Sequence, residues 1–173
     1  DWFPLINGKL GDQVLFSFYD PATKERWNEV AKPISSYEQN EMMYKRWVES
    51  RAAEVDSLSG GRLGYVHIRS MADGSYRDVY ADILGKYNLR DGIVIDTRHN
   101  GGGRLHEDIE ILFTGEKYLE QVIQGTVVCD MPSRRYNKHS IMLVSEDNYS
   151  NAHGTPWVYQ HQKIGSIVGM PVP

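Results

Sequence analysis

The sequence has 173 residues, of which 40% are hydrophobic and 24% charged, and its formal net charge is −4. A chain of this size can bury a sizeable core in one globular domain, with part of a second. The acidic balance argues against a nucleic acid as partner, because no stretch of the chain concentrates Lys and Arg.

Other classes of protein are excluded by what the sequence lacks. Cys129 is the single cysteine, so the chain can form no internal disulfide and no cysteine-based metal site. No apolar run reaches the roughly 20 residues of a membrane-spanning helix. The chain opens abruptly with "DWFPLING" and closes with "IVGMPVP", and we expect it to be a fragment or processed piece.

The first third predicts a β-hairpin followed by a long helix. Residues 13–19 alternate like a strand, and after the turn-forming "DPAT" residues 26–34 can return as a second strand. The stretch Ser35–Glu38 has the spacing of a helix capping box. The apolar residues that follow have the spacing of one helix face; they are Tyr44, Trp47, Val48, Ala52 and Val55. "SGG" at 59–61 is expected to end the helix, and we place a domain boundary near it.

From residue 62 the pattern alternates between strands and helices. Strands are predicted at 63–68, 92–97, 122–130, 140–145 and 166–172, and helices at 76–88, 105–113 and 155–162. Pro156 suits the first turn of the last helix. Strands that alternate with helices predict an α/β layered fold.

A run of three glycines, residues 101–103, begins four positions after the end of the strand at 92–97. A Walker loop needs G-x-x-x-x-G-K-[ST], whereas Arg104 and Leu105 follow these glycines, and the spacing does not fit G-x-G-x-x-G. A tight turn is one interpretation of the run. The other is a nest of backbone N–H groups aimed at a developing negative charge, as in an oxyanion hole.

An oxyanion hole needs a nucleophile nearby, and a second strand-to-helix corner offers one. It reads "LVSEDNYSNAHGTPW" at 143–157. Nucleophiles of α/β proteins lie at such corners, where a strand gives way to a helix.

Three stretches together resemble the S41 family of serine peptidases, and within it the tricorn-like branch. "GGRLGYVHIRSM" is similar to the first strand of the protease core, and "GIVIDTRHNGGG" to the strand and glycine turn of the oxyanion hole. "IMLVSEDNYSNAHGTPWVYQHQKIGSIVGMPVP" is similar to the nucleophile corner with its following helix and strand. The resemblance implies a crotonase- or ClpP-like ββα spiral core at 62–173, incomplete at its C-terminal end. It also implies a connecting helix at 36–61 and the C-terminal part of a β-rich PDZ-like module at 1–35.

The family's corner reads roughly Tyr-Ser-x-Ser-Asp-Gly, and its second serine attacks. Laid on "YSNAHG", this serine falls on Ala152, and His153 replaces the acidic residue. A methyl group cannot attack a carbonyl. We therefore favour loss of the nucleophile at Ala152, natural or engineered, with Ser150 as the alternative nucleophile.

Gly101, Gly102 and His153 are the expected N–H donors of the oxyanion hole. The resemblance further implies a catalytic histidine upstream of the PDZ-like module and a carboxylate downstream of the last strand.

The remaining titratable residues favour structural roles. His99 and His153 flank the two corners and could form a polar pair or a metal site, but the spacing lacks an H-E-x-x-H motif. We expect no metal and no cofactor. Acidic residues at the start of the helix at 105–113 suit its dipole.

Two functions are compatible with these observations. The first is a serine endopeptidase core that acts on a peptide or unfolded protein and is inactive as given. The second is a non-catalytic module that binds an extended peptide in the same groove by strand addition. Residues 101–103 and 152–153 are predicted to meet across one cleft. The resemblance leaves open the oligomeric state and a location in the bacterial cell envelope, periplasm or cytoplasm.

Overall fold

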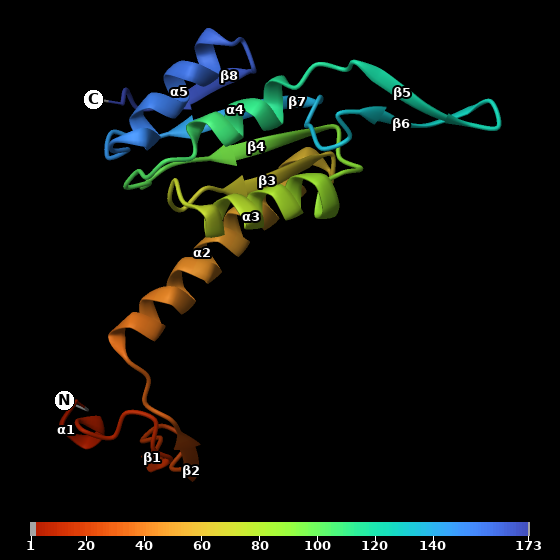
Figure 1. Cartoon of the computed structure of the whole chain (residues 1–173). Coiled ribbons are helices and arrows are strands. Elements are labelled where there is room, and N and C mark those ends of the chain that lie inside the picture. Colours follow the sequence, from red (N-terminus) through yellow and green to blue (C-terminus); the bar gives the residue numbers. More distant parts are fainter. Residues whose placement is uncertain (1–2, 173) are drawn as a thin grey trace. The chain divides into compact units, whose positions relative to one another are not determined.

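The computed structural model describes residues 3–172, which form two compact units (Figure 1). The units divide between Trp47 and Val48, within one long helix, whereas the sequence placed a domain boundary near residue 61. The assignment of residues 1–35 to a PDZ-like module stays a prediction.

The first unit contains the expected hairpin. Strand β1 (Val14–Tyr19) pairs antiparallel with β2 (Arg26–Ala31), after a short helix α1 (Phe3–Ile6). Phe18 stacks on Trp27 across the two strands, with ring centroids 5.3 Å apart. The two strands form a sheet of their own, which confirms the predicted strand–turn–strand pattern.

Helix α2 (Ser36–Ser59) begins and ends where the sequence predicted. Its capping box is formed: the Glu38 N–H donates to Ser35 Oγ (3.1 Å), and the Glu38 carboxylate accepts from the Ser35 N–H (2.8 Å). These reciprocal bonds satisfy N–H groups that have no partner within the helix. The helix ends at Ser59, directly before the two glycines.

The second unit is built on a four-stranded parallel sheet in the order β3-β4-β7-β8. Its strands are β3 (Leu63–His67), β4 (Gly92–Asp96), β7 (His139–Val144) and β8 (Ser166–Gly169). The crossovers contain α3 (Asp73–Ala81), which continues as the π-helical turn η1 (Asp82–Lys86), α4 (His106–Thr114) and α5 (Asn151–His161). Sequential parallel strands with crossovers of one hand place the helices on one face of the sheet (Figure 1). The predicted α/β class is confirmed.

One hydrophobic core joins the sheet to these helices. Every second strand residue points into it, as the period of a strand requires. It contains Val66, Ile93, Ile95, Met142 and Val144 from the strands, and Val79, Ile83, Ile109, Leu112 and Tyr159 from the helices. Because the strands are parallel, their carboxyl ends meet at one edge of the sheet, and both corners described above lie there.

One predicted strand is wrong. Residues 122–130 form most of a hairpin, in which β5 (Leu119–Ile123) pairs antiparallel with β6 (Thr126–Met131) outside the parallel sheet. Gln124 (φ 50°) and Gly125 (φ 79°) form the turn between them. Positive φ at both central residues is typical of a two-residue hairpin turn. This Gln-Gly pair lies in the interior of the strand predicted at 122–130.

Two helix boundaries also differ from the prediction. Helix α3 begins at Asp73 rather than 76, and α5 begins at Asn151 rather than 155, so Pro156 lies inside the helix instead of in its first turn. Proline has no N–H to donate to the carbonyl four residues earlier, which is that of Ala152. The Asn148 side-chain amide donates to this carbonyl instead, at 3.5 Å.

Candidate active site

The two corners touch at the carboxyl edge of the sheet. The Tyr149 N–H donates to the Asn100 carbonyl oxygen (3.0 Å). A Cβ atom added to Gly102 would lie 2.7 Å from Ser150 Cβ and 2.7 Å from the Tyr149 carbonyl oxygen. The glycine turn therefore meets the corner after β7 at residues 149 and 150, whereas the sequence predicted a meeting with residues 152–153.

Close backbone approach explains two of the three glycines. Gly102 has a φ of 95° and faces the second corner, as described above. Gly103 forms an isolated parallel bridge with Met71, and a Cβ atom there would lie 1.9 Å from the Met71 carbonyl oxygen. Gly101 has open space around the position of a Cβ atom. The run thus lets the turn fit between two other backbone segments.

Asn100 shapes the glycine turn from inside. Its side chain has no exposed surface; Nδ2 donates to the Ile68 carbonyl (2.7 Å), and Oδ1 accepts from the Gly102 N–H (2.9 Å). The His153 N–H donates to the Ser150 carbonyl (2.9 Å). The expectation that the Gly102 and His153 N–H groups point at one external atom is therefore wrong, because both donate within the chain.

The Gly103 N–H has a different direction. The Met71 N–H donates to the Gly102 carbonyl (2.9 Å), and the Arg104 N–H donates to the Met71 carbonyl (2.6 Å). Successive N–H groups of an extended segment point to opposite sides. The Gly103 N–H consequently points away from Met71, and Gly103 lines a cavity together with Ser150.

Ser150 and Ala152 occupy very different environments. Ser150 is exposed and has φ 56° and ψ −123°, at the sharp turn into α5. A non-glycine residue in this backbone region is strained, and the nucleophile elbow of α/β hydrolases is a strained turn of this kind. Ala152 is the second residue of the helix, is 0% exposed and belongs to the hydrophobic core.

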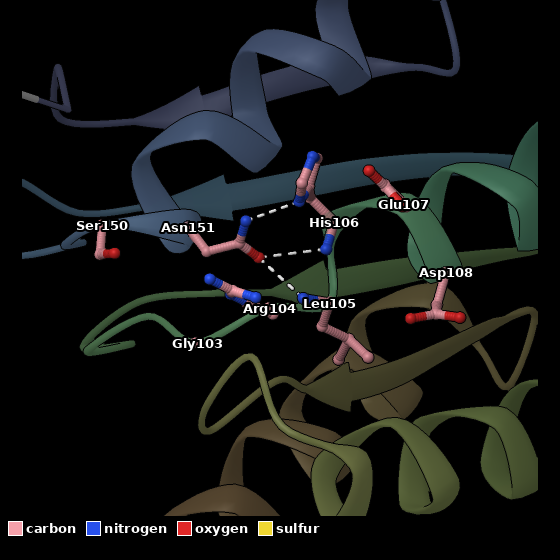
Figure 2. A pocket seen from close by; sticks show the side chains of 8 residues that line it. All are labelled: Gly103, Arg104, Leu105, His106, Glu107, Asp108, Ser150 and Asn151. Carbon is pink, nitrogen blue, oxygen red and sulfur yellow. Dashed lines mark hydrogen bonds between the residues drawn. The ribbon is translucent and has the colours of Figure 1, made fainter.

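Asn151 ties the second corner to helix α4. Its Oδ1 accepts from the Leu105 N–H (2.9 Å) and from the His106 N–H (3.1 Å). Its Nδ2 lies 2.6 Å from Nδ1 of His106. Figure 2 shows these three interactions, with the Asn151 amide between Ser150 and the first turn of α4. The carbonyl oxygen of Asn151 thereby satisfies two N–H groups at the start of a helix.

A cavity of about 460 Å³ opens beside this contact. It is lined by Gly103, Arg104, Leu105, His106, Glu107, Asp108, Ser150 and Asn151 (Figure 2). The candidate nucleophile, the glycine turn and four residues with ionisable side chains thus border one space.

His99 pairs with Asp147 rather than with His153. Its Nδ1 lies 2.7 Å from Asp147 Oδ2, and its N–H donates to Ser145 Oγ (3.1 Å). Hydrogen bonds from Ser145 and His99 lower the pKa of Asp147 to about 2. Within residues 3–172, no group of three His, Cys, Asp or Glu side chains is arranged to hold a metal ion.

An ion pair with a buried carboxylate lies at the end of β4. Asp96 is 0% exposed and accepts hydrogen bonds from the Arg98 guanidinium, at 2.6 Å from Nη2, and from the Tyr65 hydroxyl (2.7 Å). Burial raises the pKa of Asp96, but the bonds from Arg98 and Tyr65 outweigh it and hold the pKa below its ordinary value. Asp96 therefore stays ionised at the end of β4.

Comparison with known proteins identifies the family. Residues 62–172 match the sequence model of peptidase family S41, so the chain belongs to this family of proteolytic enzymes. It is 30% identical to tricorn protease homolog 1 of Streptomyces coelicolor over 129 residues, which are 75% of this chain and 11% of that protein. It is 27% identical to the tricorn protease of Thermoplasma volcanium over 135 residues, which are 73% of this chain and 12% of that protein.

A solved structure supports the same fold. The crystal structure of the tricorn protease superimposes with a TM-score of 0.73, covering 96% of this chain and 16% of that one, at 18% identity. The chain thus spans less than a fifth of the length of these relatives. Among the described residues, no helix has the length and apolar character to cross a membrane.

Proposed function

We propose that this chain carries the nucleophile corner of a serine peptidase and that Ser150 is the attacking residue. The observation that carries the proposal is the strained, exposed backbone of Ser150 at the head of α5, on a cavity shared with Gly103. At position 152 a hydroxyl would be enclosed in the core, where a peptide cannot reach it. Of the two candidate positions, only Ser150 has the access that an attacking group needs.

The N–H groups of Gly103 and Asn151 are the oxyanion donors that this arrangement favours. The Gly103 N–H points away from Met71, and the Asn151 N–H belongs to the first turn of α5, where N–H groups lack helical partners. The positive end of the helix dipole adds to the stabilisation of an anion there. This set replaces Gly101, Gly102 and His153.

The reaction we propose is acyl transfer. As Ser150 Oγ bonds to the peptide carbonyl carbon, its proton passes to a base, and the carbonyl oxygen becomes the oxyanion held by the two N–H groups. Collapse of this intermediate breaks the C–N bond, and the amine leaves with a proton from the conjugate acid of the base. Water then hydrolyses the acyl-serine. The substrate is a peptide or an unfolded protein.

The general base is the part that residues 3–172 do not supply at Ser150. No side-chain base in this range forms a hydrogen bond with the Ser150 hydroxyl. The resemblance to S41 peptidases assigns the base to a histidine in another part of the longer proteins of this family. We therefore expect residues 1–173 alone not to hydrolyse peptides measurably, since an unassisted serine is a weak nucleophile.

An external base tests the proposal directly. The chain is mixed with a peptide p-nitrophenyl ester and imidazole, and the initial burst of p-nitrophenol is recorded. We expect an imidazole-dependent burst that Ser150→Ala abolishes and that Ser166→Ala, at an exposed serine of β8, leaves intact. A burst that survives in Ser150→Ala would refute the assignment. Peptide binding without any burst would favour the non-catalytic peptide-binding module.

A further inference from the structure

We propose that Asn151 is a positioning residue for Ser150, and that it holds the nucleophile corner against α4 fully only while His106 is neutral. This inference rests on the proposed role of Ser150. It concerns the side chain of Asn151, which contacts α4 rather than the substrate and acts through the neighbouring Ser150. The three hydrogen bonds between Asn151 and the start of α4 carry it.

The orientation of the Asn151 amide is fixed by its partners. One end of the amide meets two backbone N–H groups, from Leu105 and His106, and can therefore only be the carbonyl oxygen. The NH2 group must then be the end that faces the His106 ring, 2.6 Å from Nδ1. A donor there requires a lone pair on Nδ1, which a neutral His106 ring has when it carries its proton on Nε2.

Protonation of His106 removes this arrangement. In imidazolium both ring nitrogens are donors, so an Nδ1–H group would face the NH2 group of Asn151. The amide cannot rotate to offer its oxygen without losing both backbone N–H groups of α4. The ring must therefore leave, and the NH2 group of Asn151 loses its partner.

The other ionisable groups near the ring do not replace Asn151. They are Arg104, Glu107 and Asp108 on the same cavity, Glu110 one turn along α4, and His153 on the neighbouring α5. Glu110 accepts a hydrogen bond from Gln162 of α5 at 2.9 Å. Within residues 3–172, none of these five side chains is hydrogen-bonded to the His106 ring.

The link to Ser150 is covalent and short. Asn151 directly follows Ser150, whose strained backbone persists only when surrounding contacts hold it. Loss of the bond to His106 loosens Asn151 and, with it, both the Ser150 hydroxyl and the neighbouring N–H donor. Loss of one net hydrogen bond is expected to reduce the reactivity of Ser150 about fivefold.

NMR tests the hydrogen bond without any activity. The nitrogen shifts of the His106 ring report its tautomer, and the Asn151 NH2 resonances are followed between about pH 8 and pH 5, where histidines change charge. We expect the Nε2–H tautomer at high pH and an Asn151 NH2 shift that titrates with the ring. This titration should vanish in His106→Gln and persist in His161→Gln, at the exposed end of α5. An Nδ1–H tautomer would overturn the proposal.

Three variants separate positioning from simple packing. Asn151→Asp keeps both bonds to backbone N–H groups and accepts from Nδ1–H of either neutral or charged His106. Asn151→Leu keeps the bulk without any bond. The imidazole-dependent burst of each variant and of the unaltered chain is measured at about pH 8 and pH 5. Each value is divided by the burst of His161→Gln at the same pH. Because imidazole titrates equally in the two assays, this ratio removes the effect of pH on the external base.

We expect the ratio of the normalised burst of Asn151→Asp to that of the unaltered chain to be about fivefold larger at the lower pH than at the higher pH. Asn151→Leu should be impaired at both. Equal pH responses of the Asp variant and the unaltered chain would overturn the inference. A burst that survives Ser150→Ala would instead refute the proposed function. The NMR test of the hydrogen bond between Asn151 and His106 does not depend on that outcome.

Discussion

Gly102 and Ser150 are in direct contact, although they belong to loops that follow different strands. The space that a side chain would need at Gly102 is occupied by Ser150 Cβ and the Tyr149 carbonyl oxygen, both 2.7 Å away. This contact brings the glycine turn and the candidate nucleophile into one site. It also makes the site sensitive to one methyl group.

Gly102→Ala is expected to push the two corners apart. Its φ of 95° disfavours any side chain, and the Tyr149 backbone cannot move aside as a flexible side chain would. We expect a loss of about 2 kcal/mol in the free energy of unfolding and loss of the imidazole-dependent burst. Urea denaturation measures the first effect.

Gly101→Ala is the matched control for this variant, since nothing lies within 4 Å of its Cβ position. We expect its stability to change by less than about 0.5 kcal/mol. Equal effects at the two glycines would contradict the structure of the turn.

Asp96→Asn is expected to destabilise the core of the second unit. The substitution leaves the Arg98 guanidinium opposite a neutral amide at a fully buried position. Breaking a buried ion pair by removing one partner costs about 3 kcal/mol. Asp73→Asn is the control, because its ion pair with Arg77 is exposed and should contribute little to stability. Similar losses in both variants would count against the buried pair.

The same carboxylate predicts a dependence of stability on pH. Its pKa is lower in the folded protein than the ordinary value of about 4 in the unfolded chain, so its contribution is present above that pH. The contribution is lost as the pH falls through the folded-state pKa. The free energy of unfolding should therefore decline below about pH 4, and less steeply in Asp96→Asn. The decline with falling pH that remains in Asp96→Asn includes the contribution of Asp147, whose pKa is lowered to about 2.

Ala152→Ser tests the alternative nucleophile position. The new hydroxyl would lie in a fully enclosed space, where burial of a polar group costs about 1 to 2 kcal/mol unless it finds a partner. We expect a lower free energy of unfolding and no increase in the imidazole-dependent burst. A burst from Ala152→Ser that persists in the double variant with Ser150→Ala would restore position 152 as the nucleophile position.

Much of the fold could be predicted because its strands are short apolar runs bounded by turn residues. Residues 92–97 are one example. The hairpin of β5 and β6 was missed because Gln124 adopts a positive φ, a conformation that its residue type does not predict. Helix α5 was expected too late because Pro156 suggests a helix start, and only the structure shows the Asn148 side chain bound to the carbonyl that proline leaves without a donor.

The contact between two loops was predictable, but the detailed chemistry of the candidate site was not. Three glycines behind a strand and a serine-containing corner pointed to the two loops that the structure brings together. The roles of Asn100 and Asn151 depend on partners 32 and 45 to 46 positions away along the chain, so no local pattern encodes them. The sequence did offer one indication of these roles, since Asn100 directly precedes the glycine run and Asn151 directly follows Ser150. The strain that distinguishes Ser150 from Ala152 is a backbone property, which only coordinates reveal.

The most direct test of the central claim is the site of reaction with a fluorophosphonate probe in the presence of imidazole, mapped by mass spectrometry. We expect phosphonylation of Ser150, about 100-fold or more faster in the folded chain than in urea, because the oxyanion donors exist only in the folded state. Ser150→Ala should abolish this labelling, and Ser166→Ala should not. Labelling of another serine, or an equal rate at Ser150 in the folded and unfolded chains, would contradict the account.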